Sequence, residues 1–126
     1  MPQYQSMDQI RATVARKAVV DLSGARRGEL LKEARAFPAT LLQVGLTHGL
    51  ALRLAKNETS DLARILTQWF NHDLCPIAWS TASPSDGYAQ LLDRLLTHPS
   101  EVWWQADEEA LAFLSWLKLF AEIYGA

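Results

Sequence analysis

The chain has 126 residues, of which 49% are hydrophobic and 21% charged, so we expect one globular domain over residues 1–126 with a core of its own. No stretch reaches the roughly 18 consecutive apolar residues of a membrane helix. The polar N-terminus carries no signal-peptide pattern, which makes a cytoplasmic location the default expectation. Cys75 is the single cysteine, which excludes an internal disulfide framework and is expected to fill apolar space.

The net charge of −2 is divided unevenly along the chain. Residues 1–56 hold nine Lys/Arg and four acids, a net charge of +5, whereas residues 57–126 hold three Lys/Arg and ten acids, a net charge of −7. A basic half can face a polyanion. It can also bind the acidic half of a second copy, head to tail. Ordinary solvated surfaces would produce the same numbers, so charge alone does not choose among the three.

The first half of the chain predicts three helices from apolar residues at helical spacing. The first covers residues 7–22 and is ended by Gly24. The second covers residues 26–36, and Pro38 marks a break before a third helix that runs to about Lys56. Gly45 and Gly49 inside the third helix are costly there, which indicates either close approach of another backbone or a bend at Gly45.

The second half predicts three more helices. Thr59 or Ser60 can cap a fourth helix whose apolar stripe ends at Trp69 and Phe70. A loop over residues 75–86, held by Ile77 and Trp79, separates it from a fifth helix over residues 85–97. The sixth, over residues 107–124, follows a turn for which residues 101–104 leave a helical conformation open, and it has the strongest stripe, so we expect it at the centre. Its first residues, Asp107, Glu108 and Glu109, would place negative charge at a helix N-terminus. With no strand pattern, the fold class is all-α, a compact bundle of about six helices.

The chemistry-bearing residues form no recognisable catalytic or metal-binding pattern. The histidines His48, His72 and His98 lack both HExxH and zinc-ligand spacing. His72 and Cys75 leave open a metal site, or a nucleophilic pair in a small hydrolase, but Pro76 and the loop argue against a preorganised pocket. No glycine-rich phosphate loop is present. We therefore expect no catalytic residues, no metal and no cofactor.

The tryptophans divide into two groups. Trp69 and Trp116 lie on apolar stripes and are predicted core residues. Trp103 and Trp104 are adjacent and cannot both point inward from one helix, so at least one should be exposed or covered by a partner. An exposed tryptophan suits a protein interface or a stacked base, and the alternative is that both pack beneath the proline-containing loop.

Two stretches carry a resemblance to a known family. Residues 103–111 read WWQADEEAL and residues 112–122 read AFLSWLKLFAE, while residues 37–46 read FPATLLQVGL. The chain resembles the small subunit of type III-B CRISPR effector complexes, the Cmr complexes, over nearly its whole length. That family typically has Arg where this chain has Trp104, and Thr where it has Asp107. The first departure removes a possible RNA-facing charge. The second is mild, because Asp and Thr both cap helices.

The resemblance implies a non-catalytic structural protein of antiviral defence. Several copies would stack head to tail beside the backbone subunits of a ribonucleoprotein and line the channel for CRISPR RNA and target RNA. The candidate phosphate-binding residues are Arg11, Arg16, Lys17, Arg26, Arg27, Arg53 and Lys56, and the candidate interface residues are Trp103 and Trp104. The alternative function is a helical protein-interaction module with no nucleic-acid role.

Overall fold

The computed structural model describes residues 6–56, 60–77 and 88–125. These residues form five helices and no strand: α1 (Met7–Val20), α2 (Gly24–Ala55), α3 (Asp61–Phe70), α4 (Tyr88–Leu96) and α5 (Ser100–Tyr124). The all-α prediction is confirmed. The count is five in place of about six because the predicted second and third helices form one element. No helix in the described parts of the chain is long and apolar enough to cross a membrane.

Helix α1 begins with a capping box. The Ser6 hydroxyl accepts the Gln9 backbone N–H, and the Gln9 side chain accepts the Ser6 backbone N–H in return. The helix ends at Val20, and the buried Leu22 follows it in the short connection to α2. The expectation that Gly24 ends the first helix is wrong, because Gly24 is the first residue of α2.

Pro38 does not break α2, contrary to the sequence prediction. The buried positions Ala34, Phe37 and Leu41 continue at helical spacing through the proline. Proline inside a helix costs about 3 kcal/mol through the lost hydrogen bond and its ring clash. Burial of large apolar side chains contributes a comparable amount for each one. The continuous apolar face therefore holds the helix together across Pro38.

The interruption of α2 lies at Gly45, where the backbone has φ 81° and ψ 169°. Glycine adopts this positive φ without the strain that a Cβ would bring. A Cβ placed there would also lie 3.2 Å from Asp107 Oδ2. Of the two interpretations that the sequence left open, the bend at Gly45 is confirmed. Gly49 has only ordinary contacts around it, since an added Cβ would lie 3.6 Å from Phe37 and Thr40.

Asp107 stabilises this bend from α5. Its Oδ1 accepts the Leu46 backbone N–H at 2.7 Å, so a residue of another helix caps the second half of α2. The prediction that residues 107–109 begin the last helix is wrong. Helix α5 starts at Ser100, because Val102 and Ala106 already bury an apolar face that continues into Ala110 and Phe113.

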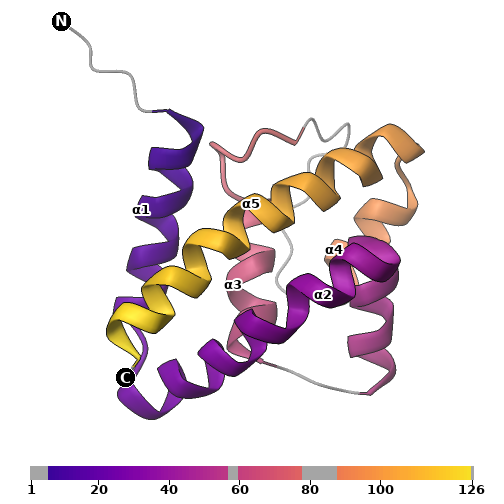
Figure 1. Ribbon diagram of the computed structural model, residues 1–126. Helices are drawn as coiled ribbons and strands as arrows, with labels where there is room; N and C mark the ends of the chain where they lie inside the picture. Colours follow the sequence, from indigo (N-terminus) through magenta and orange to yellow (C-terminus); the bar gives the residue numbers. More distant parts are fainter. Residues whose placement is uncertain (1–5, 57–59, 78–87, 126) are drawn as a thin grey trace, which may run out of the picture.

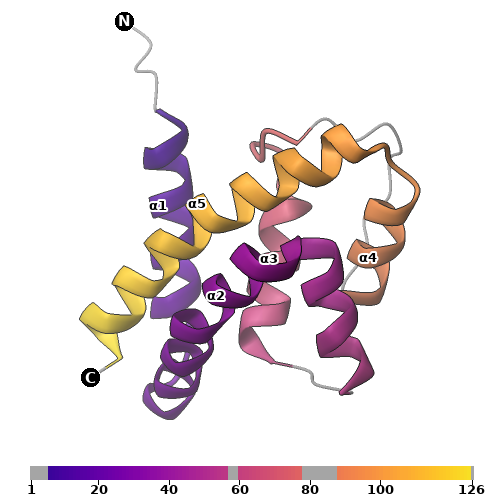
Figure 2. The ribbon, with the colours of Figure 1, turned by 45° about the vertical axis from the view of Figure 1, so that its right-hand side comes forward.

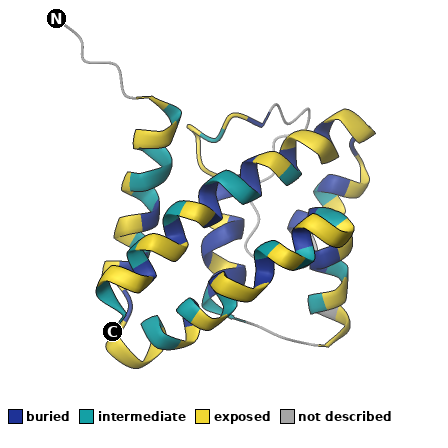
Figure 3. Ribbon diagram, in the orientation of Figure 1, coloured by how far each residue is buried: buried dark blue, intermediate teal, exposed yellow. Residues whose placement is uncertain are grey.

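The core lies between α5 and the other helices. Helix α5 runs across the front of the bundle, with the first half of α2 beside it and α3 behind (Figures 1 and 2). Trp69 of α3 is fully buried and stacks on Phe113 of α5, with ring centroids 5.1 Å apart. The buried surfaces of the helices face one another (Figure 3). The predictions of a central last helix and a core Trp69 are confirmed.

The remaining predictions hold in part. Trp116 is half-buried at the edge of the core, where it stacks on Phe120. Ser60 caps α3 by accepting the Ala63 backbone N–H. Helix α4 lies within the predicted range 85–97, although residues 85–87 fall outside the described part of the chain, as do Thr59 and Trp79.

Candidate functional site

Arg11 forms a part-buried ion pair with Glu109, whose own side chain is buried. Its Nη2 and Nε donate to the two carboxylate oxygens of Glu109 at 2.6 and 2.7 Å, and its Nη1 donates to Asp8. Glu109 also accepts the indole N–H of Trp69 at 3.0 Å. The hydrogen bonds to Glu109 raise the pKa of Arg11 well above its usual range. This candidate for phosphate contact joins α1 to α5, and no sequence pattern indicates that Glu109 is its partner.

Arg27 joins two helix ends. Its guanidinium donates to the backbone carbonyls of Val19 and Val20 at the end of α1 and of Tyr124 at the end of α5. Those carbonyls lie in the last turns of their helices, where the terminal C=O groups lack intrahelical partners. A cation also interacts favourably with the negative ends of the two helix dipoles. Arg27 therefore stabilises the place where both helices end.

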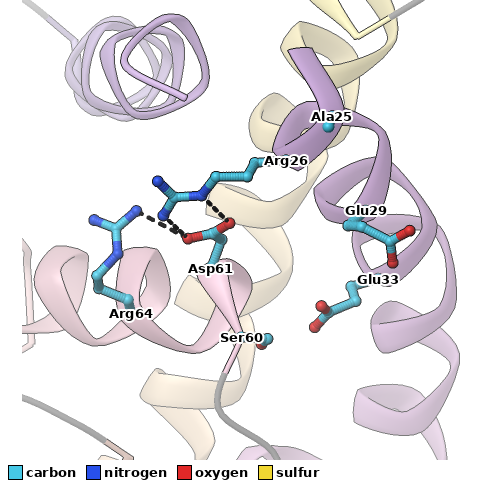
Figure 4. Close-up of a pocket in the computed structure, with 7 residues that line it drawn as sticks. All are labelled: Ala25, Arg26, Glu29, Glu33, Ser60, Asp61 and Arg64. Carbon is cyan, nitrogen blue, oxygen red and sulfur yellow. Dashed lines mark hydrogen bonds and ion pairs between the residues drawn. The ribbon is translucent and has the colours of Figure 1, made fainter. Parts of the chain in front are cut away.

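Arg26 binds Asp61 at the start of α3. Two guanidinium nitrogens donate to the carboxylate at 2.5 and 3.0 Å, and Arg64 donates to it at 3.3 Å. These hydrogen bonds, that from Arg26 first, lower the pKa of Asp61. Figure 4 shows the two arginines converging on Asp61, beside an open pocket of about 620 Å³ that Glu29 and Glu33 line from α2. Both cations of this pocket are thus already bound to Asp61, and the carboxylates of Glu29, Glu33 and Asp61 outnumber them.

Arg53 and Lys56 lie at the end of α2 and differ in exposure. The Arg53 side chain is 20% exposed, its guanidinium carbon lies 5.2 Å from the Phe37 ring centroid, and its Nη1 lies 3.7 Å from Glu33. Lys56 is exposed, and the structure shows no ion pair for it among the described residues. Unlike Arg53, Lys56 can therefore reach a phosphate without breaking an ion pair among the residues that the structure describes.

Arg16 and Lys17 line a groove between α1 and α5. The groove has a volume of about 410 Å³ and is lined by Ala12, Thr13, Arg16, Lys17, Val20 and Phe120. Lys17 forms an exposed pair with Asp21, and Arg16 donates to the Tyr124 hydroxyl at 3.2 Å. Exposed pairs of this kind are worth only about 0.3–0.5 kcal/mol and exchange readily. Both cations are available to an external partner.

The adjacent tryptophans have different surroundings. The indole N–H of Trp103 donates to the Leu95 carbonyl at 2.5 Å, which fastens it to the end of α4. Trp104 is 63% exposed, one of the most exposed large apolar side chains of the described chain. The expectation that at least one of the two lies at the surface agrees with this arrangement.

The His72 and Cys75 region does not have the character of a nucleophile site. Burial is the main cause that raises the pKa of the Cys75 thiol to about 12, so the thiol is neutral near pH 7. His72 Nδ1 accepts the Leu74 backbone N–H at 3.0 Å, which occupies that ring nitrogen in a local turn. Over the described residues, no three His, Cys, Asp or Glu side chains gather in a way that could hold a metal ion.

The seven candidate cations therefore do not form one surface. Arg11 and Arg27 hold helices together, and Arg26 and Arg53 are engaged with carboxylates of the same chain. Arg16 and Lys17 form one exposed set on α1, and Lys56 forms another at the end of α2. Sequence reasoning could not separate these groups, because the partners lie up to 98 residues away along the chain.

Comparison with known proteins gives the family. No individually curated protein matches the chain. Residues 7–124 match the family described as CRISPR-associated protein (Cas_Cmr5), which covers all five helices. The resemblance seen in residues 37–46 and 103–122 thus extends over nearly the whole chain. The chain belongs to the Cmr5 family of CRISPR-associated proteins and is a small subunit of type III-B Cmr complexes, associating with other Cmr subunits.

Proposed function

We propose that this chain is a non-catalytic structural subunit of a type III-B CRISPR ribonucleoprotein in the cytoplasm. Several copies stack head to tail beside the backbone subunits, and the stack lines the channel for CRISPR RNA and target RNA. In antiviral defence, the cleavage of RNA falls to other subunits. The match of residues 7–124 to the Cmr5 family carries this proposal.

The exposed cations support the RNA part of the proposal. Arg16 and Lys17 on α1, and Lys56 just after α2, are exposed and have no buried charged partner among the described residues. Each phosphate contact releases counterions, so the slope of log affinity against log salt changes by about 0.7–0.9 per contact. The other four candidates are less suited to this role, because phosphate would have to displace a carboxylate or a helix carbonyl.

Co-purification tests the proposal directly. The tagged protein is isolated gently from its native host, and the proteins and RNA bound to it are identified. We expect CRISPR-derived guide RNA together with backbone subunits. Unrelated proteins recovered without RNA would overturn the proposal.

Charge variants of the assembled complex then identify the RNA-facing set. The double variant Arg16→Gln/Lys17→Gln and the single variant Lys56→Gln remove the two exposed sets separately, and Lys118→Gln on α5 is the matched control. Replacing the set that faces RNA should lower the affinity for RNA and make the dependence of that affinity on salt shallower. An unchanged affinity in both variants would exclude the RNA-lining role.

The exposed apolar side chains favour one alternative, a helical protein-interaction module without a nucleic-acid role. Trp104 is 63% exposed and Leu42 is 75% exposed. Salt dependence separates the two functions. An interface made mainly of apolar contacts keeps its affinity as salt rises, whereas several phosphate contacts lose affinity steeply.

A further inference from the structure

Trp104 stands on an acidic face of α5. Glu101 and Glu108 lie three residues before it and four residues after it, so all three project from the same side of the helix. All three are exposed, and among the described residues the structure shows no ion pair for either glutamate. We call Trp104 with these two glutamates the knob. The face of an exposed indole and its two neighbouring carboxylates can all attract a cationic partner, and tryptophan is enriched at interface hot spots.

The groove between α1 and α5 has the complementary chemistry. Phe120 forms one wall, in an aromatic row in which its ring centroid lies 6.2 Å from that of Trp116 and 6.3 Å from that of Tyr124. Arg16 and Lys17 supply two cations, while Ala12 and Thr13 leave room between the helices. An indole entering this groove can stack on Phe120 and lie against a cation. Its flanking carboxylates can pair with Arg16 and Lys17.

We infer that the knob of one copy occupies the α1–α5 groove of the next copy, which rests on the proposed function and identifies the contact through which copies stack. Trp104 and Phe120 are 16 residues apart on α5, and a helix rises about 1.5 Å per residue, so the two surfaces lie about 24 Å apart along it. A contact between two different surfaces is heterologous and leaves a free knob and a free groove at the ends. Head-to-tail stacking uses each contact once, so the product is an open stack and not the twofold dimer in which each copy's knob would enter the other's groove.

This assignment separates the two exposed sets of cations. Arg16 and Lys17 face the acidic knob of the neighbouring copy, and Lys56 is left for phosphate. A nucleotide, with its base on Phe120 and its phosphate on Arg16, would use the same groove. The second copy is favoured because one contact covers the exposed Trp104 and neutralises both glutamates as well as both cations.

The test uses one variant of each surface. Trp104→Ala removes the indole of the knob, and Arg16→Glu/Lys17→Glu reverses the charge of the groove. Their matched controls are Leu42→Ala, an exposed apolar residue on α2, and Lys32→Glu/Lys118→Glu, an equal change of charge elsewhere. Circular dichroism melts confirm that each variant folds. Sedimentation velocity over a range of concentrations measures self-association.

Wild-type protein is expected to grow beyond the dimer as its concentration rises. Each surface variant alone should associate about thirtyfold more weakly, as for loss of an interface hot spot, while the controls match the wild type. The decisive sample is the mixture. One intact knob then meets one intact groove, so the two variants form a one-to-one dimer that grows no further.

Several results would overturn the inference. Wild-type protein that stays monomeric, or that stops at a dimer, excludes an open stack through these surfaces. A mixture that fails to form the dimer excludes the pairing of knob with groove. A groove variant that still self-associates but loses guide RNA in the assembled complex assigns the groove to a nucleotide. In that last case guide RNA still co-purifies with the wild type, so the proposed function stands although the knob contact fails.

Discussion

Two arginine–carboxylate pairs of similar geometry differ in what surrounds them. Arg11–Glu109 joins α1 to α5, and the side chains of the pair are 16% and 4% exposed. Arg26–Asp61 joins α2 to α3, and its arginine is 55% exposed. Both are bidentate, with hydrogen bonds of 2.5–3.0 Å. Water can replace the partner in the second pair but not in the first, so burial decides which pair the fold depends on.

Replacing Arg11, the less exposed of the two arginines, should give the largest effect. Arg11→Gln leaves the buried Glu109 side chain without its cationic partner, which should lower the free energy of unfolding by about 3–5 kcal/mol in urea melts. In the double variant Arg11→Met/Glu109→Gln, both charges are gone and the amide oxygen can still accept the Trp69 N–H, so most of the loss should be recovered. A loss below about 1 kcal/mol in the single variant would mean that solvent reaches this pair as it reaches Arg26.

A second prediction extends the comparison to pH. In the folded protein the Cys75 thiol has a pKa of about 12, raised mainly by burial, whereas an unfolded cysteine titrates near 8.5. Below pH 8.5 the thiol is protonated in both the folded and the unfolded protein, so its contribution to the free energy of unfolding is fully present. Above it only the unfolded state releases the proton, and the free energy of unfolding should fall by about 1.4 kcal/mol per pH unit.

Urea melts at pH 8, 9 and 10 measure this dependence, with Cys75→Ala as the matched variant. The difference between wild type and variant should change by about 2 kcal/mol across that range. Thiol labelling of the native protein should also be slow, because the neutral thiol is a poor nucleophile. Parallel pH profiles for the two proteins would show that the thiol is accessible to water.

The half-buried carboxylate of Asp107 should have an intermediate effect. Asp107→Ala removes the cap on Leu46 N–H and should cost about 1–2 kcal/mol, whereas Asp107→Asn keeps an acceptor and should cost less. Glu108→Ala, at the exposed neighbouring position, should stay within about 0.5 kcal/mol of wild type. Equal losses for Ala and Asn would mean that the carboxylate acts through its charge and not as a cap.

The smallest effect is expected at the exposed pair. Arg26→Gln makes the same change as Arg11→Gln but leaves an Asp61 carboxylate that Arg64 and water can satisfy. The melting temperature should stay within measurement error at ordinary salt, with any difference vanishing in high salt. A loss as large as that of Arg11→Gln would contradict the assignment of stability to burial.

The bend in α2 shows where sequence reasoning stopped. Pro38 and Gly45 were both visible as possible breaks, and local rules favour the proline. The structure breaks the helix at Gly45 because Asp107, 61 residues away from Leu46, supplies the missing acceptor. Local reasoning also misplaced the start of α5. Three consecutive acids suggest the N-terminus of a helix. They lie instead inside α5, whose buried apolar face already includes Val102 and Ala106.

The candidate site was predicted as a set of residue types and not as a surface. The sequence alone shows that basic residues exceed acidic ones in the first half of the chain and that acidic residues exceed basic ones in the second. The division of those cations into buried, engaged and exposed groups depends on Glu109, Asp61 and Glu33, whose positions follow from the packing of α5, α3 and α2. Trp103 and Trp104 could be recognised as unable to share one inward face. Which of them is the more exposed depended on where α4 ends.

The sequence by itself determined the fold class, the central last helix, the buried Trp69 and the family. The first three follow from apolar periodicity, which is a local property of the chain, and the family follows from the resemblance carried by residues 37–46 and 103–122. Tertiary structure alone decided where α2 bends, which carboxylate meets Arg11 and which cations remain in solvent. The physical reason is that a hydrogen bond or an ion pair acts over a few ångströms in space, whatever the separation in sequence, so its partner exists only once the helices have packed.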